Sequence, residues 1–137
     1  KLKQGITVIR DFAPDLPRID AYPGELNQVW TNLIDNAIDA MQGHGVLRLT
    51  AGIEGDRLRV EIADNGPGIP AHVLPRIFDV FFTTKAPGEG TGLGLHVSAN
   101  IAQKHGGDIA VDSKPGDTRF VVRLPLRQQG APAIGAK

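Results

Sequence analysis

The apolar residues between Glu25 and Met41 recur at intervals of three and four, and this repeat restricts the fold more than any other feature of the chain. Residues with that spacing lie along one side of an α-helix, so the segment is predicted to be an amphipathic helix. Pro23 and Gly24 mark its start, and the sequence GHG (43–45) marks its end. The apolar residues of this helix are Leu26, Val29, Trp30, Leu33, Ile34, Ala37, Ile38 and Met41.

The segments on either side of this helix have an apolar period of two, which is typical of β-strands. Residues 6–12 (ITVIRDF) alternate well enough for one strand. Residues 46–53 and 57–64 are separated only by EGD, which predicts a hairpin. The residues expected to face a core from this hairpin are Leu47, Leu49, Leu58, Val60 and Ile62.

The order of the predicted elements defines the fold class. The other elements are a short extended link at 16–22, a short helix at 70–78, a helix at 95–105, and closing strands at 108–113 and 118–126. Gly106 and Gly107 follow the second long helix and are a usual C-terminal cap. Hairpin-linked strands without repeated crossover units predict an α/β (α+β) two-layer sandwich, in which a mostly antiparallel mixed sheet carries helices packed on one face.

The length and composition describe one globular domain. The 137 residues suffice for one sizeable core, and we assign residues 1–126 to it. Residues 127–137 lack any period and are expected to form a flexible tail. Because the chain lacks an initiator methionine, we expect it to be a piece of a longer protein.

The same composition excludes several classes of partner. A formal net charge of zero provides no basic excess, so no nucleic-acid partner is expected. The absence of cysteine excludes disulfides and thiolate metal sites, and it is compatible with the cytosol. No apolar stretch approaches the roughly 18 residues of a membrane span, and the start has no signal-peptide pattern. We therefore expect no direct membrane contact.

Two polar motifs are candidates for ligand binding. Asn32 and Asn36 lie four residues apart and stack on one side of the predicted helix, where amide oxygens suit Mg²⁺; an isolated pair of this kind is also often merely solvated. Asp64 begins DNGPGIP (64–70) at a strand end. This segment is either an ordinary turn or a site where the carboxylate accepts the amino group of adenine while the glycines admit a flat ring.

A third candidate is FDVFFTTK (78–85) followed by GEGTGLGL (88–95). The phenylalanines favour a place in the core. The glycine spacing fits neither the dinucleotide fingerprint GxGxxG nor the P-loop pattern, and no strand precedes the run. Thr83, Thr84 and Lys85 place hydroxyls and a cation before a helix N-terminus, which favours phosphate. The segment is therefore interpreted as a hinged lid.

In order and spacing, these motifs resemble the N, G1, F, G2 and G3 boxes of the catalytic ATP-binding domain of sensor histidine kinases. The matching segments, within about Ile6 to Pro125, are NQVWTNLIDNAIDAM, DNGPGIP, FDVFFTTK, GTGLGL and GDTRFVVRLP. The family fold, called the Bergerat fold, is the two-layer sandwich already predicted. The resemblance implies binding of ATP and Mg²⁺, and transfer of the γ-phosphate to a histidine on a separate helical dimerisation and phosphotransfer domain, for relay to a response regulator. It also implies that the chain lies in the cytoplasm, where it could be the cytoplasmic part of a membrane-bound sensor.

The resemblance also assigns roles to individual residues. It implies that Asn36 coordinates Mg²⁺, that Asn32 lies beside the phosphates, and that Asp64 binds the adenine amino group with water-mediated support from Thr118. Gly66, Gly68 and Ile69 are expected to shape the base pocket. The phosphates are assigned to Lys85 and to the backbone of Gly90, Thr91, Gly92, Leu93 and Gly94, with Leu95 anchoring the following helix.

Several positions depart from the usual pattern. Asp39 stands where many relatives have a lysine, which makes Lys85 the expected cationic contact. Asp79 and Val80 replace the commoner Glu-Pro, and Trp30 replaces a usual leucine. The phosphoacceptor histidine is expected outside this chain, because His44, His72, His96 and His105 lie in no matching motif and are interpreted as surface or capping residues.

Two alternatives share the fold. Gyrase-, chaperone- and mismatch-repair-type ATPases have a water-activating glutamate at the position of Asn32, and an amide cannot act as that base. Glu25 is about two helical turns earlier, roughly 10 Å along the axis. A kinase is therefore preferred over an ATPase, and a non-catalytic ATP-binding docking module stays open.

Overall fold

The computed structural model describes residues 5–14, 23–79 and 94–126, which form a five-stranded sheet with two long helices. The strands are β1 (Ile6–Phe12), β2 (Gly45–Glu54), β3 (Arg57–Asp64), β4 (Asp108–Lys114) and β5 (Asp117–Pro125), and the helices are α1 (Pro23–Met41) and α2 (Gly94–Lys104). All seven agree with the sequence prediction, apart from small shifts at their ends. The predicted link at 16–22 and tail at 127–137 lie outside the described residues.

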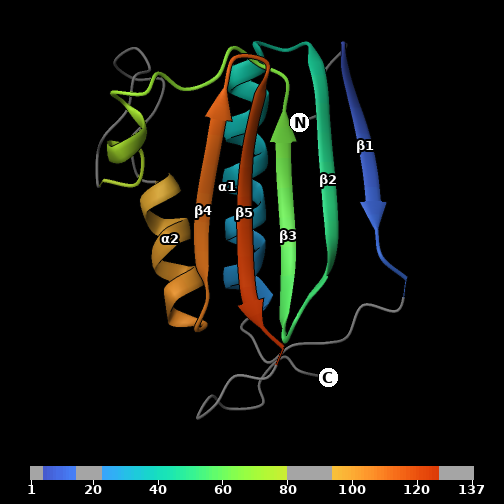
Figure 1. Cartoon of the computed structure of the whole chain (residues 1–137), viewed down its shortest axis with the longest axis vertical. Helices are drawn as coiled ribbons and strands as arrows, with labels where there is room; N and C mark the ends of the chain where they lie inside the picture. The colour runs from blue at the N-terminus through green and yellow to red at the C-terminus, as the bar shows by residue number, and fades with distance from the viewer. Residues whose placement is uncertain (1–4, 15–22, 80–93, 127–137) are drawn as a thin grey trace.

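The sheet is mixed, with the strand order β1-β2-β3-β5-β4. The β2–β3, β3–β5 and β4–β5 pairs are antiparallel, and β1 runs parallel to β2. Both long helices lie on one face of the sheet, with α1 behind its centre and α2 beside β4 (Figure 1). The predicted two-layer sandwich is therefore confirmed.

The core lies between α1 and the covered face of the sheet. Residues at alternate positions of the strands point toward the helices, as the pleat of a strand requires. Leu47 and Ile62 are buried there, whereas Leu58 at the start of β3 is only half-buried. The buried core cluster comprises Val29, Leu33, Ala37, Met41, Leu47, Ile62, Ile77, Phe120, Val122 and Leu124.

The short helix predicted at 70–78 is reduced to a single 3₁₀ turn, Leu74–Arg76. Bonds from the Val73 amide to the Pro70 carbonyl and from the Arg76 amide to the Val73 carbonyl join residues three apart, and a single bond from the Leu74 amide to the Pro70 carbonyl joins residues four apart. Pro75 has no N–H to donate to the residue four positions earlier, so an α-helix cannot continue through it. The predicted helix was thus too long.

The end of α2 matches the predicted glycine stop. Gly106 has φ +81°, and its amide donates to the carbonyl of Gln103, while the Gly107 amide donates to the carbonyl of Ala102. These two bonds are those of a Schellman motif, which needs a residue in the left-handed region. His105 is the last residue before the turn, so the cap fixes where α2 ends and β4 begins.

Candidate nucleotide-binding site

Asp64 is the last residue of β3, and its side chain is 4% exposed. It follows Ile62 at the strand period of two, so it points toward the helices rather than the open face. The backbone N–H of Gly66 donates to Oδ1 at 2.9 Å. Because an ionised carboxylate offers about four acceptor positions, this bond leaves capacity for a ligand donor.

The pKa of Asp64 is raised above the ordinary value of a carboxyl group. Burial is the largest cause; the charge of Asp117 also raises the pKa, and the hydrogen bond from Gly66 opposes the shift. No salt bridge to Asp64 occurs among the described residues. A buried carboxyl without a cationic partner is costly, and such groups are found at functional sites more often than elsewhere.

Thr118 lies opposite Asp64 in the β3–β5 register and is also 4% exposed. Its hydroxyl is 2.7 Å from that of Ser113, and the Ser113 hydroxyl accepts a bond from the backbone N–H of Ile69 at 2.8 Å. Ser113 therefore joins the loop after β3 to the strand that carries Thr118. Sequence reasoning did not identify Ser113, although Ser113 and Thr118 face each other across a turn containing Pro-Gly.

The two predicted glycines of this loop have little room around them. A Cβ atom on Gly66 would lie 3.0 Å from Oδ1 of Asp64 and 3.2 Å from the Ala40 carbonyl oxygen. Gly68 has φ +91°, and a Cβ atom there would lie 2.8 Å from the carbonyl group of Lys114. Gly68 thus requires glycine, and a side chain at Gly66 would have to displace the Asp64 carboxylate or the end of α1.

An open hollow of about 490 Å³ lies beside this loop. It is lined mainly by apolar groups, and Gly68, Ile69 and Leu74 are among its lining residues. Neither Asp64 nor the asparagines of α1 contribute to it. The hollow therefore borders the candidate site but is not the place where its polar groups meet.

Asn32 and Asn36 are both half-buried on α1. The side-chain nitrogen of Asn32 donates to the carbonyl oxygen of Gly94 at 3.0 Å and to the hydroxyl of Ser98 at 3.1 Å, so this amide binds the first turn of α2. Among the residues that the structure describes, the side chain of Asn36 has no hydrogen-bond partner. The two asparagines are thus in different environments: one is anchored to α2, and the other is available to a ligand.

Of the predicted phosphate contacts, only the last ones can be located. Lys85, Gly90, Thr91, Gly92 and Leu93 lie outside the described residues. Gly94 begins α2, and Leu95 packs against the hydrophobic core, as expected for an anchor of that helix. Phe78 packs edge-on against Phe120, with ring centroids 6.3 Å apart, which agrees with the core role predicted for it.

The histidines agree only in part with the sequence interpretation. His44 and His72 are exposed, and His105 is at the C-terminal cap of α2 but is only 1% exposed. The ring of His96 is half-buried, and its Nδ1 lies 3.1 Å from the carbonyl oxygen of Phe78. His96 thus joins the first turn of α2 to the segment after the 3₁₀ turn, which was not foreseen.

The carboxylate of Glu25 is directed to the far end of α2. It lies 2.8 Å from Nζ of Lys104 and 3.9 Å from Nε2 of His105. A helix of 11 residues is about 16 Å long, so these contacts are far from the end of α2 that binds Asn32. Glu25 therefore does not stand in for a water-activating base beside Asn32.

A metal ion at this site would have few protein ligands. In the described parts of the chain, no group of three or more His, Cys, Asp or Glu side chains could hold a metal ion. The donors that the structure brings to the site are the amide oxygens of the two asparagines on α1. Such a donor set suits Mg²⁺ carried by a ligand's own phosphates. Separately, none of the described helices is both long enough and apolar enough to cross a membrane.

Comparison with known proteins assigns the chain to a family. Residues 21–128 match the model of the histidine kinase-, DNA gyrase B- and HSP90-like ATPases. The chain is 48% identical over 112 residues to the sensor histidine kinase ZraS of Escherichia coli O157:H7, covering 81% of this chain and 24% of ZraS. It is 34% identical over 139 residues to the sensory histidine kinase/phosphatase NtrB of the same organism, covering 93% of this chain and 39% of NtrB.

Solved structures give the same result. The catalytic domain of histidine kinase ThkA superposes with a TM-score of 0.80 at 32% identity, covering 89% of this chain and 80% of that one. Full-length ShkA in complex with AMPPNP superposes with a TM-score of 0.77 at 32% identity, covering 95% of this chain and 27% of ShkA. The chain belongs to the histidine kinase-, DNA gyrase B- and HSP90-like ATPase family, and within it corresponds to the catalytic ATP-binding domain of sensor histidine kinases. It spans about a quarter to two fifths of the curated relatives it matches.

Proposed function

We propose that this chain binds Mg·ATP and donates the γ-phosphate to a histidine on a separate helical dimerisation and phosphotransfer domain, for relay to a response regulator. The observation that carries the proposal is the buried carboxyl of Asp64 at the end of β3, enclosed by a glycine loop and facing the asparagine-bearing helix α1. The similarity to sensor histidine kinases supports the same function. In such a protein, residues 1–126 are the catalytic domain.

The adenine end of the site follows from hydrogen-bond chemistry. Asp64 accepts the amino group of adenine, because its carboxylate is buried and retains acceptor capacity beyond the bond from Gly66. Thr118, opposite Asp64, supports the base through water. Gly66, Gly68 and Ile69 let the ring approach the backbone. Guanine has an acceptor in place of that amino group, so it is rejected by roughly 1–3 kcal/mol.

The phosphate end uses α1 and the start of α2. The amide oxygen of Asn36 is a hard donor without a protein partner among the described residues, and it is the group that would ligate Mg²⁺. Bound there, Mg²⁺ neutralises charge on the triphosphate. Asn32 lies beside the phosphates, and Lys85 with the backbone of residues 90–94 contacts them.

Phosphoryl transfer depends on positioning and charge neutralisation more than on covalent chemistry by the protein. The chain is therefore expected to bind ATP without phosphorylating itself, because its histidines lie outside any phosphoacceptor motif. The position of Glu25, paired with Lys104 at the far end of α2, favours a kinase over a water-activating ATPase. The chain itself is proposed to be cytoplasmic, including as the cytoplasmic part of a membrane-bound sensor.

Two measurements test the proposal. Calorimetry with ATP and GTP in the presence of Mg²⁺ should show binding of ATP and much weaker binding of GTP. Addition of a cognate dimerisation domain and γ-labelled ATP should then produce phosphohistidine on that domain and none on this chain. Rapid phosphate release without an acceptor would identify an ATPase, and binding without transfer would identify a docking module.

A further inference from the structure

The amide of Asn32 has a defined orientation, because its nitrogen is committed to α2. Nδ2 lies 3.0 Å from the carbonyl oxygen of Gly94 and 3.1 Å from Oγ of Ser98. A carbonyl oxygen can only accept a hydrogen bond, so the amide nitrogen, and not the amide oxygen, must face Gly94. The oxygen Oδ1 is therefore directed away from α2.

The oxygen of the same amide has a hydrogen-bond partner that a ligand could replace. Oδ1 accepts a bond from Nε2 of Gln28 at 3.2 Å, and this contact between residues four apart on α1 is exposed to solvent. An exposed amide–amide bond is weak in net terms, since water replaces it at little cost. A ligand can take the place of Gln28 only with a metal ion that the oxygen coordinates or with a group that donates a hydrogen bond to the oxygen, such as a metal-bound water.

Ser98 is the side chain that holds the amide of Asn32 against α2. It is 0% exposed, lies one turn after Gly94 on the face of α2 that meets α1, and has a hydroxyl whose partner is Asn32. A buried hydroxyl needs a partner, and the two N–H groups of the amide match one carbonyl and one hydroxyl. Reversal of the amide would cost the bond to the Gly94 carbonyl, whereas the Ser98 hydroxyl, which can donate as well as accept, fixes the position of the amide rather than which end faces α2.

We infer that Ser98 is a positioning residue: it holds the Asn32 amide against α2, where the Gly94 carbonyl binds the nitrogen, so that the oxygen serves the bound nucleotide. Asn32 then acts on the metal ion or its waters and gives no hydrogen bond to a phosphate oxygen. This inference rests on the proposed binding of Mg·ATP. It assigns to Asn32 a contribution that depends on the metal, which a simple phosphate contact would not show.

The test measures ATP affinity by calorimetry for the wild-type chain and the Ser98→Ala variant, each with Mg²⁺ and with a chelator. Replacing an outer partner of a metal-site ligand commonly costs about 10-fold or more in metal affinity. We therefore expect Ser98→Ala to lose about 10-fold in affinity with Mg²⁺ and to match the wild type with the chelator. Ser98→Thr keeps the hydroxyl and should bind ATP with Mg²⁺ as tightly as the wild type. Thr31→Ala removes an exposed hydroxyl beside Asn32 and should leave the ATP affinity unchanged both with Mg²⁺ and with the chelator.

Equal losses with and without Mg²⁺ would overturn the inference, because they would show a general structural role, and so would an unchanged affinity. The wild-type titration tests the proposed function by itself: if the wild-type chain binds no ATP, the proposed function is wrong. The comparison with Ser98→Ala tests the role of Ser98.

Nuclear magnetic resonance tests the orientation without any nucleotide. The side-chain N–H protons of Asn32 should exchange with solvent more slowly than those of Asn65, whose oxygen rather than nitrogen is bonded, to the Val46 amide. Ser98→Ala should speed the exchange at Asn32 alone. Equal exchange at Asn32 and Asn65 in the wild type would contradict the assigned orientation.

Discussion

Asp64 and Glu61 lie three residues apart on β3 and therefore point to opposite faces of the sheet, where they have different polar partners. Both are buried, at 4% and 8% exposure. Glu61 is held on the open face by Nη2 of Arg59 at 3.0 Å and by Nη1 of Arg119 at 4.0 Å. Asp64, on the covered face, has a backbone bond but no salt bridge among the described residues.

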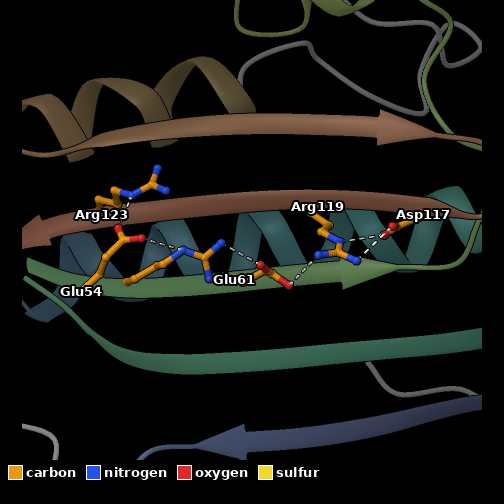
Figure 2. Close-up of polar contacts among 6 residues, drawn as sticks. Glu54, Glu61, Asp117, Arg119 and Arg123 are labelled. Carbon is orange, nitrogen blue, oxygen red and sulfur yellow. Dashed lines mark hydrogen bonds and ion pairs between the residues drawn. The ribbon is translucent and has the colours of Figure 1, made fainter.

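The open face continues this pairing into a charged ladder, formed by Glu54, Arg59, Glu61, Asp117, Arg119 and Arg123. In Figure 2 the ladder runs along β3 and β5, on the side away from α1. Hydrogen bonds from Arg123 to Glu54 and from Arg119 to Asp117 are the largest causes of the lowered pKa of each of these two carboxyls. Burial instead raises the pKa of Asp64. On the open face the carboxylates are paired with arginines, whereas on the covered face the carboxyl of Asp64 has no salt bridge among the described residues.

The largest expected effect concerns the packing that supports the covered face. Phe120 is 1% exposed and packs edge-on against Phe78, so Phe120→Ala should lower the free energy of unfolding by about 3–5 kcal/mol. Urea denaturation measures the loss. Val121→Ala, at the next residue but on the open face, is the control and should cost clearly less; equal losses would mean that the two faces contribute equally to the core.

The second prediction tests the proposed role of the Asp64 carboxyl in binding adenine. Asp64→Asn places a donor where the adenine amino group needs an acceptor, so ATP affinity should fall by about 1–3 kcal/mol, or roughly 5- to 150-fold. Asp112→Asn removes an exposed carboxylate from β4 and should leave the affinity unchanged in the same calorimetric titration. If Asp64→Asn bound ATP as tightly as the wild type, the adenine assignment would be wrong.

The third prediction concerns pH. The raised pKa of Asp64 means that the folded chain holds this proton more tightly than the unfolded chain, whose value is near 3.8. The associated stability is present below that pH and is lost as pH rises through the folded-state pKa. Asp64→Asn should therefore be more stable than the wild type at neutral pH, and the advantage should vanish near pH 4. An advantage that was independent of pH would point to packing rather than charge.

The smallest effect is expected on the open face. Arg119 is paired with Asp117 and Glu61 but is well exposed, so Arg119→Ala should lower the melting temperature only slightly at low salt. The difference should disappear at high salt, because exposed ion pairs are screened. ATP affinity should not change. A salt-independent loss of stability would show that the arginine stem covers Val121 or Glu61 rather than acting through charge.

The sequence predicted the fold closely wherever local patterns are strong. The helix at Pro23–Met41, the hairpin of β2 and β3, and the glycine stop of α2 follow from periodicity and turn residues within short segments. The segment after Pro70 was overpredicted, because its apolar spacing suits a helix while Pro75 removes a necessary donor. Among the candidate site residues, Asp64 could be chosen because a carboxylate and glycines follow a strand directly.

What the sequence by itself determined is the set of elements and the residue types that could bind Mg·ATP, since both depend on neighbours along the chain. Only the tertiary structure brought Ser98 to Asn32, 66 residues apart, and placed Ser113 between Ile69 and Thr118. It also gave arginine partners to Glu61, while no described arginine pairs with Asp64. Hydrogen bonds and ion pairs act over a few ångströms in space, so the partners of a side chain are decided by the packing of distant segments rather than by the local pattern.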